Sequence, residues 1–315
     1  MQIIDSITEI KKLRLPLALA LGNFDGVHLG HQALLDKCVA KSREKGWIPS
    51  ALLWDPHPAQ VVQRKKQQFK FLNTLEQRYQ LLKSSGINYV FCLPFDLRVA
   101  SLSPQDFVQE YLVNLMKIKA AFVGFNYSFG QKGSGGSELL KEIGDQKGFE
   151  VCIIEPIYLE GQIVSSTLIR QKYEAGDMLG AAKYLGYYPT IEGPVVTGQS
   201  RGREMGYPTA NIEVSPFQAL PSFGVYVTMT EYDGKQYPSI VNIGERPTFN
   251  SKNVTVEVFI FNFNQKIYQQ KLKISLLEKI RSEEKFKSKE ALQAQIDLDI
   301  KAAFEIFKKD NFNLC

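Results

Sequence analysis

The chain has 315 residues, about twice the length of a typical single domain, so we expect two domains. Hydrophobic residues make up 44% and charged residues 23% of it, as in globular proteins. No apolar run approaches the ~20 residues that span a bilayer, and the first residues lack a secretion-signal pattern, so we predict no membrane partner. The net charge of +5 is a mild excess, concentrated only at residues 64–66, and we predict no nucleic-acid partner.

Cysteine and histidine are scarce, and their positions limit the chemistry of the chain. The four cysteines lie far apart and form no Cys-x-x-Cys pair, which predicts a cytoplasmic protein without a disulfide framework or a thiolate zinc site. The three histidines are His28, His31 and His57. All of them lie in the first fifth of the chain, so any histidine chemistry is expected there.

The first part of the sequence alternates between strands and helices. Apolar runs that end at turn residues predict strands at 17–21, 51–54, 89–93, 120–123 and 151–154. Helical spacing of apolar residues predicts helices at 30–45, 74–85, 104–117 and 137–147. Strands that recur after helices favour a mostly parallel sheet with helices on both faces, so we predict an α/β, Rossmann-like domain over residues 1–185.

The pattern changes near residue 186. Alternating residues predict strands at 225–229, 239–242 and 254–260. Asp233 and Gly234 predict a hairpin turn between the first two of these strands. Long helical spacing returns only at about 288–308. We therefore predict a second domain over residues 186–315, a mainly antiparallel β-barrel or sandwich with a terminal helix.

The motif G-N-F-D-G-V-H-L-G-H occupies residues 22–31, at the predicted turn from a strand into a helix. In an open α/β sheet, ligands bind beyond the carboxyl ends of the strands. Glycines let the backbone approach a phosphate, and a helix N-terminus supplies unpaired N–H groups. His28 and His31 are three residues apart, so on such a helix they project from one face and can donate hydrogen bonds to phosphate oxygens.

Two other interpretations of this histidine pair stay open. Most pairs at this spacing are surface or capping residues. Imidazoles also bind metal ions, although no third histidine, cysteine or carboxylate lies at the usual spacing. The glycine-rich context after a strand favours phosphate chemistry, in which a preorganised donor to developing charge contributes ~2.7–4 kcal/mol.

Three further motifs follow in the first half of the chain: D-P-H-P at 55–58, G-F-N-Y-S-F-G at 124–130 and V-S-S-T-L-I-R at 164–170. Together with H-x-G-H at 28–31, they resemble, in order, the adenylyltransferase half of bacterial bifunctional riboflavin kinase/FAD synthetases, within the nucleotidyltransferase superfamily. H-x-G-H alone is shared with other classes, including class I aminoacyl-tRNA synthetases. The four motifs in order are a much more specific signal.

The resemblance implies that His28 and His31 act in catalysis by stabilising phosphates, and that the S-S-T-x-x-R run lies against the ATP phosphates. His57 is expected to line the same site. By itself, a Ser-Ser-Thr run before a helix is typical of an N-cap. The residues implied in nucleotide binding are Gly22, Asn23, Phe24, Asp25, Gly26, Asn126, Ser165, Ser166, Thr167 and Arg170. Ile163 stands where some relatives have an arginine.

A second set of motifs begins with a Gly- and Arg-rich run followed by P-T-A-N, at residues 198–211. It is not a Walker A loop, yet backbone N–H groups of such loops can cradle phosphates. Thr209 and Asn211 offer hard oxygens, which suit Mg²⁺, although an isolated P-T-A-N is typical of a simple turn. With F-G-V-Y at 223–226, N-I-G-E-R-P-T-F at 242–249 and V-E-V at 256–258, the run resembles the riboflavin kinase half of the same family.

The resemblance implies that Glu257 is the general base that takes the proton from the riboflavin 5′-hydroxyl. A glutamate on a strand is most often solvated; this one alternates with Val256 and Val258, so we expect it on the opposite face of the strand. The residues implied in binding ATP or flavin are Gly198, Arg203, Gly206, Pro208, Thr209, Asn211, Phe223, Gly224, Tyr226 and Arg246. Phe259 stands where many relatives have histidine.

The motifs span nearly the whole chain and predict a bifunctional enzyme. The resemblance implies that riboflavin is phosphorylated by ATP to FMN in the C-terminal domain, and that FMN is then adenylylated by ATP to FAD in the N-terminal domain, with release of pyrophosphate. The expected partners are small molecules, with Mg²⁺ as cofactor, and the expected assembly is a monomer or weak homo-oligomer. Two alternatives stay open: a flavin-responsive regulator that binds nucleic acid with steep salt dependence, and an RNA-charging enzyme, for which no K-M-S-K-S-like loop is visible.

Overall fold

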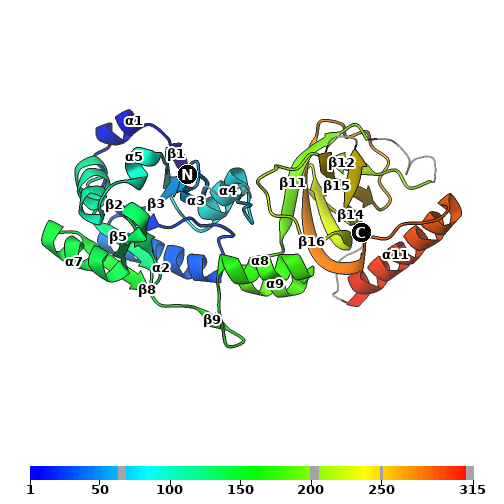
Figure 1. Cartoon of the computed structure of the whole chain (residues 1–315). Helices are drawn as coiled ribbons and strands as arrows, with labels where there is room; N and C mark the ends of the chain where they lie inside the picture. The colour runs from blue at the N-terminus through cyan, green and yellow to red at the C-terminus, as the bar shows by residue number, and fades with distance from the viewer. Residues whose placement is uncertain (63–68, 199–205, 249–250, 310–315) are drawn as a thin grey trace. The chain divides into compact units, whose positions relative to one another are not determined.

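The structure of the chain is a computed structural model that describes residues 1–62, 69–198, 206–248 and 251–309. It divides into two compact units, Met1–Ser166 and Thr167–Cys315. Figure 1 shows that the first unit is built from helices around a sheet and the second from a barrel with helices.

A six-stranded parallel sheet forms the centre of the first unit. Its order is β1-β4-β3-β2-β5-β8, and every neighbouring pair is parallel. The strands are β1 (Gln2–Ile4), β2 (Leu17–Leu21), β3 (Ile48–Trp54), β4 (Tyr89–Leu93), β5 (Ala120–Gly124) and β8 (Glu150–Ile154). From β2 the chain proceeds to β3 and β4 on one side, then returns to β5 and β8 on the other. The predicted α/β fold is confirmed, and the order of the strands reverses beside β2.

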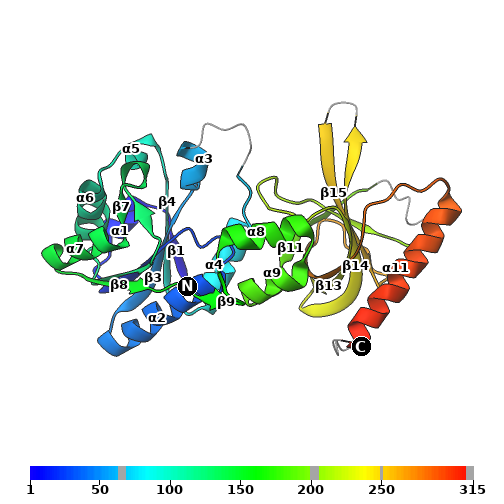
Figure 2. The ribbon, with the colours of Figure 1, turned by 60° about the horizontal axis from the view of Figure 1, so that its bottom comes forward.

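Both faces of this sheet are buried, as the apolar run of β2 requires. Leu17, Leu19 and Leu21 pack into one core, whereas Ala18 and Ala20 pack into the other, because successive side chains of a strand point to opposite faces. The leucine face is covered by α1 (Ile7–Lys12), η1 (Val108–Leu115) and α7 (Ser137–Lys147). The alanine face is covered by α2 (Leu29–Lys45) and α4 (Leu75–Ser84). Figure 2 shows helices on both sides of the sheet.

Several elements of the first unit differ from the sequence-based expectations. The helix expected at 104–117 is a short α-helix, α6 (Pro104–Phe107), that continues as the π-helix η1. Apolar spacing does not distinguish these two forms, because both place residues three to five apart on one face. Elements of two to five residues are too short to show periodicity in a sequence. They are β1, α3 (Pro58–Val62), α5 (Leu97–Ala100), η2 (Gln131–Gly133), the hairpin β6 (Ser128–Phe129) with β7 (Gly135–Gly136), and the hairpin β9 (Tyr158–Leu159) with β10 (Gln162–Ile163).

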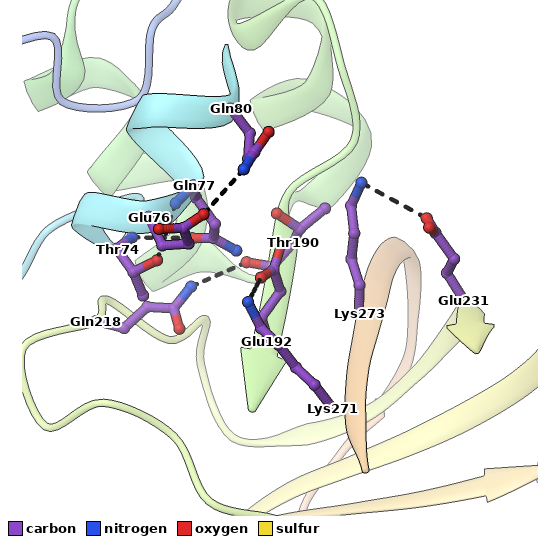
Figure 3. A network of polar contacts seen from close by, with 10 residues as sticks. All are labelled: Thr74, Glu76, Gln77, Gln80, Thr190, Glu192, Gln218, Glu231, Lys271 and Lys273. Atoms are coloured by element: carbon purple, nitrogen blue, oxygen red, sulfur yellow. Dashed lines mark hydrogen bonds and ion pairs between the residues drawn. The ribbon is translucent and has the colours of Figure 1, made fainter. Parts of the chain in front are cut away.

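Helix α4 begins with a reciprocal capping box, visible in Figure 3. The Gln77 backbone N–H donates to Thr74 Oγ1 at 3.2 Å, and the Thr74 backbone N–H donates to Gln77 Oε1 at 2.9 Å. Each bond satisfies a backbone donor that the helix itself leaves unpaired. The first turn of α4 is therefore well fixed.

A closed six-stranded antiparallel barrel forms most of the second unit. Its order is β11-β12-β15-β14-β13-β16, so the fold is a barrel and not a sandwich. The strands are β11 (Thr190–Val196), β12 (Ala210–Ile212), β13 (Gly224–Tyr232), β14 (Lys235–Thr248), β15 (Ser251–Ile260) and β16 (Lys271–Ser282). Two helices, α8 (Ser166–Ala175) and α9 (Met178–Leu185), precede the barrel, and α11 (Lys289–Lys309) follows it.

The hairpin and the terminal helix of the second unit agree with the sequence-based expectations. Tyr232 pairs with Lys235 across the turn, whose residues Asp233 and Gly234 have φ of 50° and 70°. Two residues with positive φ match the right-handed twist of the flanking strands. The terminal helix α11 buries Ala303 and Phe307 in the barrel core. An ion pair of 2.8 Å between Lys271 of β16 and Glu192 of β11 lies on the barrel (Figure 3).

Candidate active sites

Three of the four motifs of the first unit lie at one edge of the parallel sheet. Residues 22–31 follow β2, residues 55–58 follow β3, and Asn126 follows β5. These three strands are neighbours in the order β3-β2-β5, and the carboxyl ends of parallel strands meet at the same edge. The reversal of strand order beside β2 marks this edge as the expected ligand site of an open α/β sheet.

The turn that follows β2 has an unusual backbone, which is held by distant segments. Phe24, Gly26 and Val27 have φ of 48°, 84° and 34°, and two of them carry side chains that disfavour this region. The Leu72 backbone N–H donates to Asp25 Oδ1 at 2.9 Å. The Ser166 hydroxyl donates to the Asp25 carbonyl oxygen at 2.8 Å. The first and the fourth motif are therefore in direct contact.

His28 is the N-cap of α2 and is held in one protonation state. Its Nδ1 accepts a hydrogen bond from the His31 backbone N–H at 3.3 Å, so in the neutral ring the proton is on Nε2. Burial lowers the pKa of His28 from 6.5 to about 4, although a backbone hydrogen bond opposes the shift. His28 is therefore neutral at pH 7 and has an N–H donor at Nε2.

His31 lies directly against His28. The two rings stack with centroids 3.7 Å apart, and burial, followed by the charge of His28, lowers the pKa of His31 well below 6.5. Within the described residues, His31 Nδ1 is buried without a hydrogen-bond partner. A Cβ at Gly30 would lie 3.2 Å from His28 Cε1, so glycine leaves room for the histidine ring.

His57 lies at the start of α3, within an aromatic cluster. Its Nδ1 accepts from the Ala59 backbone N–H at 3.1 Å. Its ring stacks on Phe69, with centroids 5.0 Å apart, and meets the edge of Phe71 at 5.2 Å. Because these contacts involve the chain alone, the expectation that His57 lines the nucleotide site stays a prediction.

The remaining predicted nucleotide-binding residues fall into buried and accessible groups. Phe24 is fully buried and packs against the His31 ring at 5.3 Å, so its side chain supports the histidine. Asp25 is also buried, at 4% exposure. Asn126 and Thr167 are exposed, and Arg170 is half-buried on the second turn of α8. Asn23, in the first motif, is exposed as well, so that motif contains both buried and accessible polar side chains.

In the second unit, the strand register places Glu257 beside two asparagines. Glu257 of β15 lies directly opposite Asn211 of β12 and Asn242 of β14. Directly opposed residues share one face of a sheet, with Cβ atoms ~4.5–5.5 Å apart. Val256 and Val258 are buried in the barrel while Glu257 is half-buried, so the expectation that it lies on the other face is confirmed.

Gly198 and Asn211 are adjacent in the same site. A Cβ at Gly198 would lie 2.1 Å from Asn211 Nδ2, so only glycine leaves space for this amide. Thr209 immediately precedes β12 and is half-buried. Asn211 and Glu257 thus lie side by side next to Gly198, and Thr209 lies two residues before Asn211 in the sequence. Their hard oxygens fit Mg²⁺, whose remaining ligands in phosphate-transfer sites are phosphates and water.

Most of the other residues predicted for this site lie just before β12 or at the start of β13. Gly206 and Pro208 are exposed before β12, and Phe223 is exposed before β13. A Cβ at Gly224 would lie 2.2 Å from the Arg281 carbonyl oxygen, so Gly224 serves the packing of β13 on β16. Arg203 lies outside the described residues, and Arg246 is placed only by its backbone in β14.

Tyr226 has a packing role that its motif did not indicate. Its side chain is fully buried, and its hydroxyl donates to the Ser222 carbonyl oxygen. Burial raises the pKa of this hydroxyl above its ordinary value. The side chain of Tyr226 is thus committed to the barrel core, and we leave it out of the proposed ATP and flavin contacts.

Sequence reasoning did not identify Arg78 of α4, which contacts the turn after β2. Its Nη1 donates to the Asn23 carbonyl oxygen at 3.2 Å, and only 5% of the residue is exposed. An arginine in a polar helix normally indicates a solvated surface. The only available signal was the T-x-x-Q pattern at 74–77, which predicts the start of the helix but not the burial of its arginine.

Within the described residues, no three histidine, cysteine, aspartate or glutamate side chains gather as metal ligands. No helix in this part of the chain is long and apolar enough to cross a membrane. The basic run at 64–66 lies outside the described residues.

The fold and the two sites define a two-unit enzyme that transfers phosphate-containing groups. The family model described as FAD synthetase matches residues 11–168, and the one described as riboflavin kinase matches residues 185–307. The chain belongs to the family of bifunctional riboflavin kinase/FMN adenylyltransferases. This assignment places it with flavin-nucleotide enzymes and not with RNA-charging enzymes.

Curated relatives and a solved structure support this assignment over nearly the full chain. The bifunctional riboflavin kinase/FMN adenylyltransferase of Buchnera aphidicola is 36% identical and covers 100% of both chains. That of Listeria monocytogenes is 35% identical over 97% of this chain and 95% of the relative. A crystal structure described as a macrolide-efflux protein from Streptococcus pneumoniae shares the fold, with a TM-score of 0.87 and 31% identity over 96% of this chain and 97% of that one.

Proposed function

We propose that the chain converts riboflavin to FAD in two steps at two separate sites. In the second unit, ATP phosphorylates riboflavin to FMN, and in the first unit, FMN and a second ATP give FAD and pyrophosphate. The observation that supports this best is the convergence of distant motifs: the Ser166 hydroxyl bonds to the histidine turn at Asp25, and Glu257 lies opposite Asn211. We place the functional boundary between residues 185 and 186, and the riboflavin kinase model begins beside it, at residue 185.

In the adenylyl-transfer step, a phosphate oxygen of FMN attacks the α-phosphorus of ATP, and the bond from that phosphorus to the bridging oxygen of pyrophosphate breaks. Negative charge develops on the phosphoryl oxygens and the leaving group. His28 and His31 lie at the N-terminus of α2, where backbone N–H groups also favour an anion. A neutral His28 with its proton on Nε2 donates to this charge without first losing a proton, and no covalent enzyme intermediate is needed.

Exposed polar side chains of the first unit position the nucleotide in this site. They are Asn23 and Asn126. Thr167 and Arg170 belong to the second unit, and their contact with the nucleotide stays what the family resemblance implies, although an arginine can contact two phosphate oxygens at once. Ser166 is occupied with Asp25, so its role is to join the fourth motif to the histidine turn. Ser165 precedes it at the start of α8. The turn at residues 22–26 offers backbone groups to the phosphates.

In the phosphorylation step, Glu257 accepts the proton of the riboflavin 5′-hydroxyl while that oxygen attacks the γ-phosphorus of ATP, and ADP leaves. Phosphoryl transfer needs mainly positioning and charge neutralisation, so one base is sufficient. Thr209 and Asn211 would hold Mg²⁺, which neutralises phosphate charge when bound. ATP or flavin would be contacted by Gly198, Gly206 and Pro208. Backbone groups of the neighbouring motifs that the structure describes would contribute further contacts.

The partners of the chain are proposed from its chemistry alone. We expect ATP, riboflavin and FMN as small-molecule substrates, and no nucleic acid. A nucleic-acid partner would show binding that weakens steeply with salt, and binding at low salt is the direct test. We propose a cytoplasmic location, with which the free thiols of Cys38, Cys92 and Cys152 are consistent. The proposed assembly is a monomer or weak homo-oligomer.

Two point variants, each assayed in both half-reactions, test the two-site proposal. We expect His28→Ala to lower FAD formation from supplied FMN by about 100-fold or more, because a transition-state donor is lost, while FMN formation is retained. We expect Glu257→Ala to lower FMN formation by about 100-fold or more, because the base is lost, while FAD formation from FMN is retained. Folded variants that each lose both activities would show that the two sites are not separate.

A further inference from the structure

Arg78 is a buried charged side chain that neither proposed reaction uses. It lies on α4, outside every motif, with only 5% of its surface exposed. Burial lowers the pKa of Arg78 from its ordinary value, and the nearby carboxylates of Asp25 and Asp55 oppose that shift. A buried charge is unfavourable unless specific partners compensate it, so the partners of Arg78 indicate what it does.

The hydrogen-bond partner of Arg78 is the histidine turn itself. Arg78 Nη1 donates to the Asn23 carbonyl oxygen at 3.2 Å, one residue before Phe24 enters the left-handed region with φ of 48°. Residues with side chains keep such a conformation only where the surroundings fix it. The turn ends at Val27, immediately before His28, so its backbone sets the position from which the His28 ring projects.

A second set of contacts joins Arg78 to the aromatic cluster around His57. The guanidinium lies over the Phe71 ring, 5.0 Å from its centroid. Phe71 contacts the His57 ring at 5.2 Å, and the next residue, Leu72, donates its backbone N–H to Asp25 Oδ1 at 2.9 Å. Arg78 therefore contacts the turn after β2 directly. It also contacts Phe71, in the segment whose Leu72 is hydrogen-bonded to the same turn.

Helix α4 holds the guanidinium in place. Arg78 is the fourth residue of α4, and its backbone N–H donates to the Thr74 carbonyl oxygen at 3.0 Å. Thr74 and Gln77 form the capping box at this helix end (Figure 3). The base of the Arg78 side chain is thus fixed by a turn whose backbone donors are satisfied.

We propose that Arg78 is a positioning residue for adenylyl transfer, which holds the turn at residues 22–27 so that His28 and His31 face the reacting phosphates. This inference rests on the proposed function of the two histidines. Arg78 acts through the backbone of Asn23 and does not touch the substrates. A planar guanidinium can donate to a carbonyl and lie on an aromatic ring together, which a lysine ammonium does less well.

The test compares Arg78→Met and Arg78→Lys with Lys83→Met, an exposed position on the same helix. We expect Arg78→Met to lower kcat for FAD formation from FMN by about tenfold or more, because misplacement of a catalytic group slows the chemical step. KM for ATP should change by less than about threefold, since substrate contacts remain. We expect Arg78→Lys to recover only part of the loss, and Lys83→Met to match the wild type.

The fluorescence of Trp47 and Trp54, which both lie in the first unit, reports whether that unit is folded in each variant. FMN formation in the same preparations should stay within about twofold of the wild type, because the kinase site does not contain Arg78. Should Arg78→Met fail to fold, Arg78→Lys carries the test, because it keeps the charge and most of the volume. A folded Arg78→Lys with wild-type kcat, or a loss confined to KM, would overturn the inference.

A double-variant cycle with His28→Ala identifies the route of the effect. If Arg78 acts through the histidine turn, Arg78→Met should lower kcat much less in the His28→Ala background than in the wild type. If Arg78→Met lowers kcat by the same factor in the His28→Ala background and in the wild type, this route is refuted. If the single variant His28→Ala retains FAD formation, the proposed role of the histidines is wrong. If His28→Ala loses FAD formation while both Arg78 variants retain wild-type kcat, only the inference about Arg78 is wrong.

Discussion

The two units place their buried polar groups differently. In the first unit, buried polar side chains surround the proposed site: Asp25, His28 and Arg78 are 4%, 7% and 5% exposed. In the second unit, the proposed site residues Asn211 and Glu257 are half-buried. The buried polar residues of the described barrel and its helix are elsewhere, at Gln218, Thr228, Thr230, Ser239 and Asp299.

This difference predicts how closely function and stability are linked in each unit. A buried polar group that loses its partner destabilises the fold, whereas a half-exposed one can be solvated instead. Substitutions in the first site should therefore alter both activity and stability. In the second unit, activity and stability should respond to different residues.

The tryptophans allow the two units to be followed separately. The chain has two, Trp47 and Trp54, and both lie in the first unit. Urea unfolding followed by tryptophan fluorescence therefore reports the first unit, and far-UV circular dichroism reports both.

The largest effect on stability is expected for Asp299→Ala in the second unit. Asp299 is 2% exposed and accepts from Arg281 Nε at 2.9 Å and Nη2 at 2.9 Å, which joins β16 to α11. Removing one partner of a buried pair costs about 3–5 kcal/mol, so the barrel should unfold at lower urea. The circular dichroism transition measures this loss.

Glu305→Ala is the matched control, because its ion pair with Lys308 is on the exposed face of the same helix. Exposed pairs contribute about 0–1 kcal/mol, so little change is expected. An equal shift of the tryptophan transition in Asp299→Ala would contradict the separation of the two units.

The pH dependence of the first unit should reveal the buried histidine. An unfolded chain takes up a proton at His28 near pH 6.5, whereas the folded chain does so only near pH 4. The unfolded state therefore binds more protons in this range, and the free energy of unfolding should fall as the pH decreases from 6.5 to 4. For a shift of this size, the loss is about 3 kcal/mol, with His31 adding in the same direction.

Tryptophan-detected urea unfolding at a series of pH values measures this loss. His28→Asn keeps a side chain that can cap α2 but cannot titrate, so its stability should depend less on pH. In the wild type, the NMR signal of the His28 ring should titrate near pH 4. A wild type and a His28→Asn variant with the same pH dependence would show that His28 is not buried as a neutral ring.

The smallest free-energy change is expected for Gly198→Ala, and it should appear in activity alone. The new Cβ would lie 2.1 Å from Asn211 Nδ2, so the amide must move away from its place opposite Glu257. We expect FMN formation to fall by about 100-fold, equivalent to about 2.7 kcal/mol, with FAD formation from FMN unchanged.

Gly136→Ala is the control, because a Cβ there meets no atom within 4 Å. It should leave FMN formation unchanged. Because Asn211 is half-buried, the free energy of unfolding of Gly198→Ala should change by no more than about 0.5 kcal/mol. A large loss of stability would show that the second site is as tightly coupled to folding as the first.

Periodicity in the sequence was sufficient to predict most of the long helices and strands. The run at 17–21 predicts a strand buried on both faces, and its leucines and alanines do pack into two different cores. Asp233 and Gly234 predict the hairpin that is found. Strand β16 was missed although it has 12 residues, because its apolar residues are interrupted by charged ones and by β-bulges opposite Val225–Thr228.

Motifs in the sequence indicated the residues of both proposed sites. His28 and Asn126 follow the neighbouring strands β2 and β5, and Glu257 lies on β15 opposite Asn211 of β12. Arg78 was missed because the contacts that bury it come from Asn23 and Phe71, which are distant in sequence. The packing role of Tyr226 was missed for the same reason, since its hydroxyl is buried among groups of the barrel.

The sequence by itself determined the α/β class of the first unit, the change of pattern near residue 186, and the family to which the motifs belong. These follow from local spacing, which is set by the geometry of single strands, helices and turns. Only the tertiary structure decided that the second unit closes into a barrel, that His28 is a neutral donor, and that Arg78 supports the histidine turn. Closure, burial and pKa depend on which distant segments meet, and no local pattern specifies that.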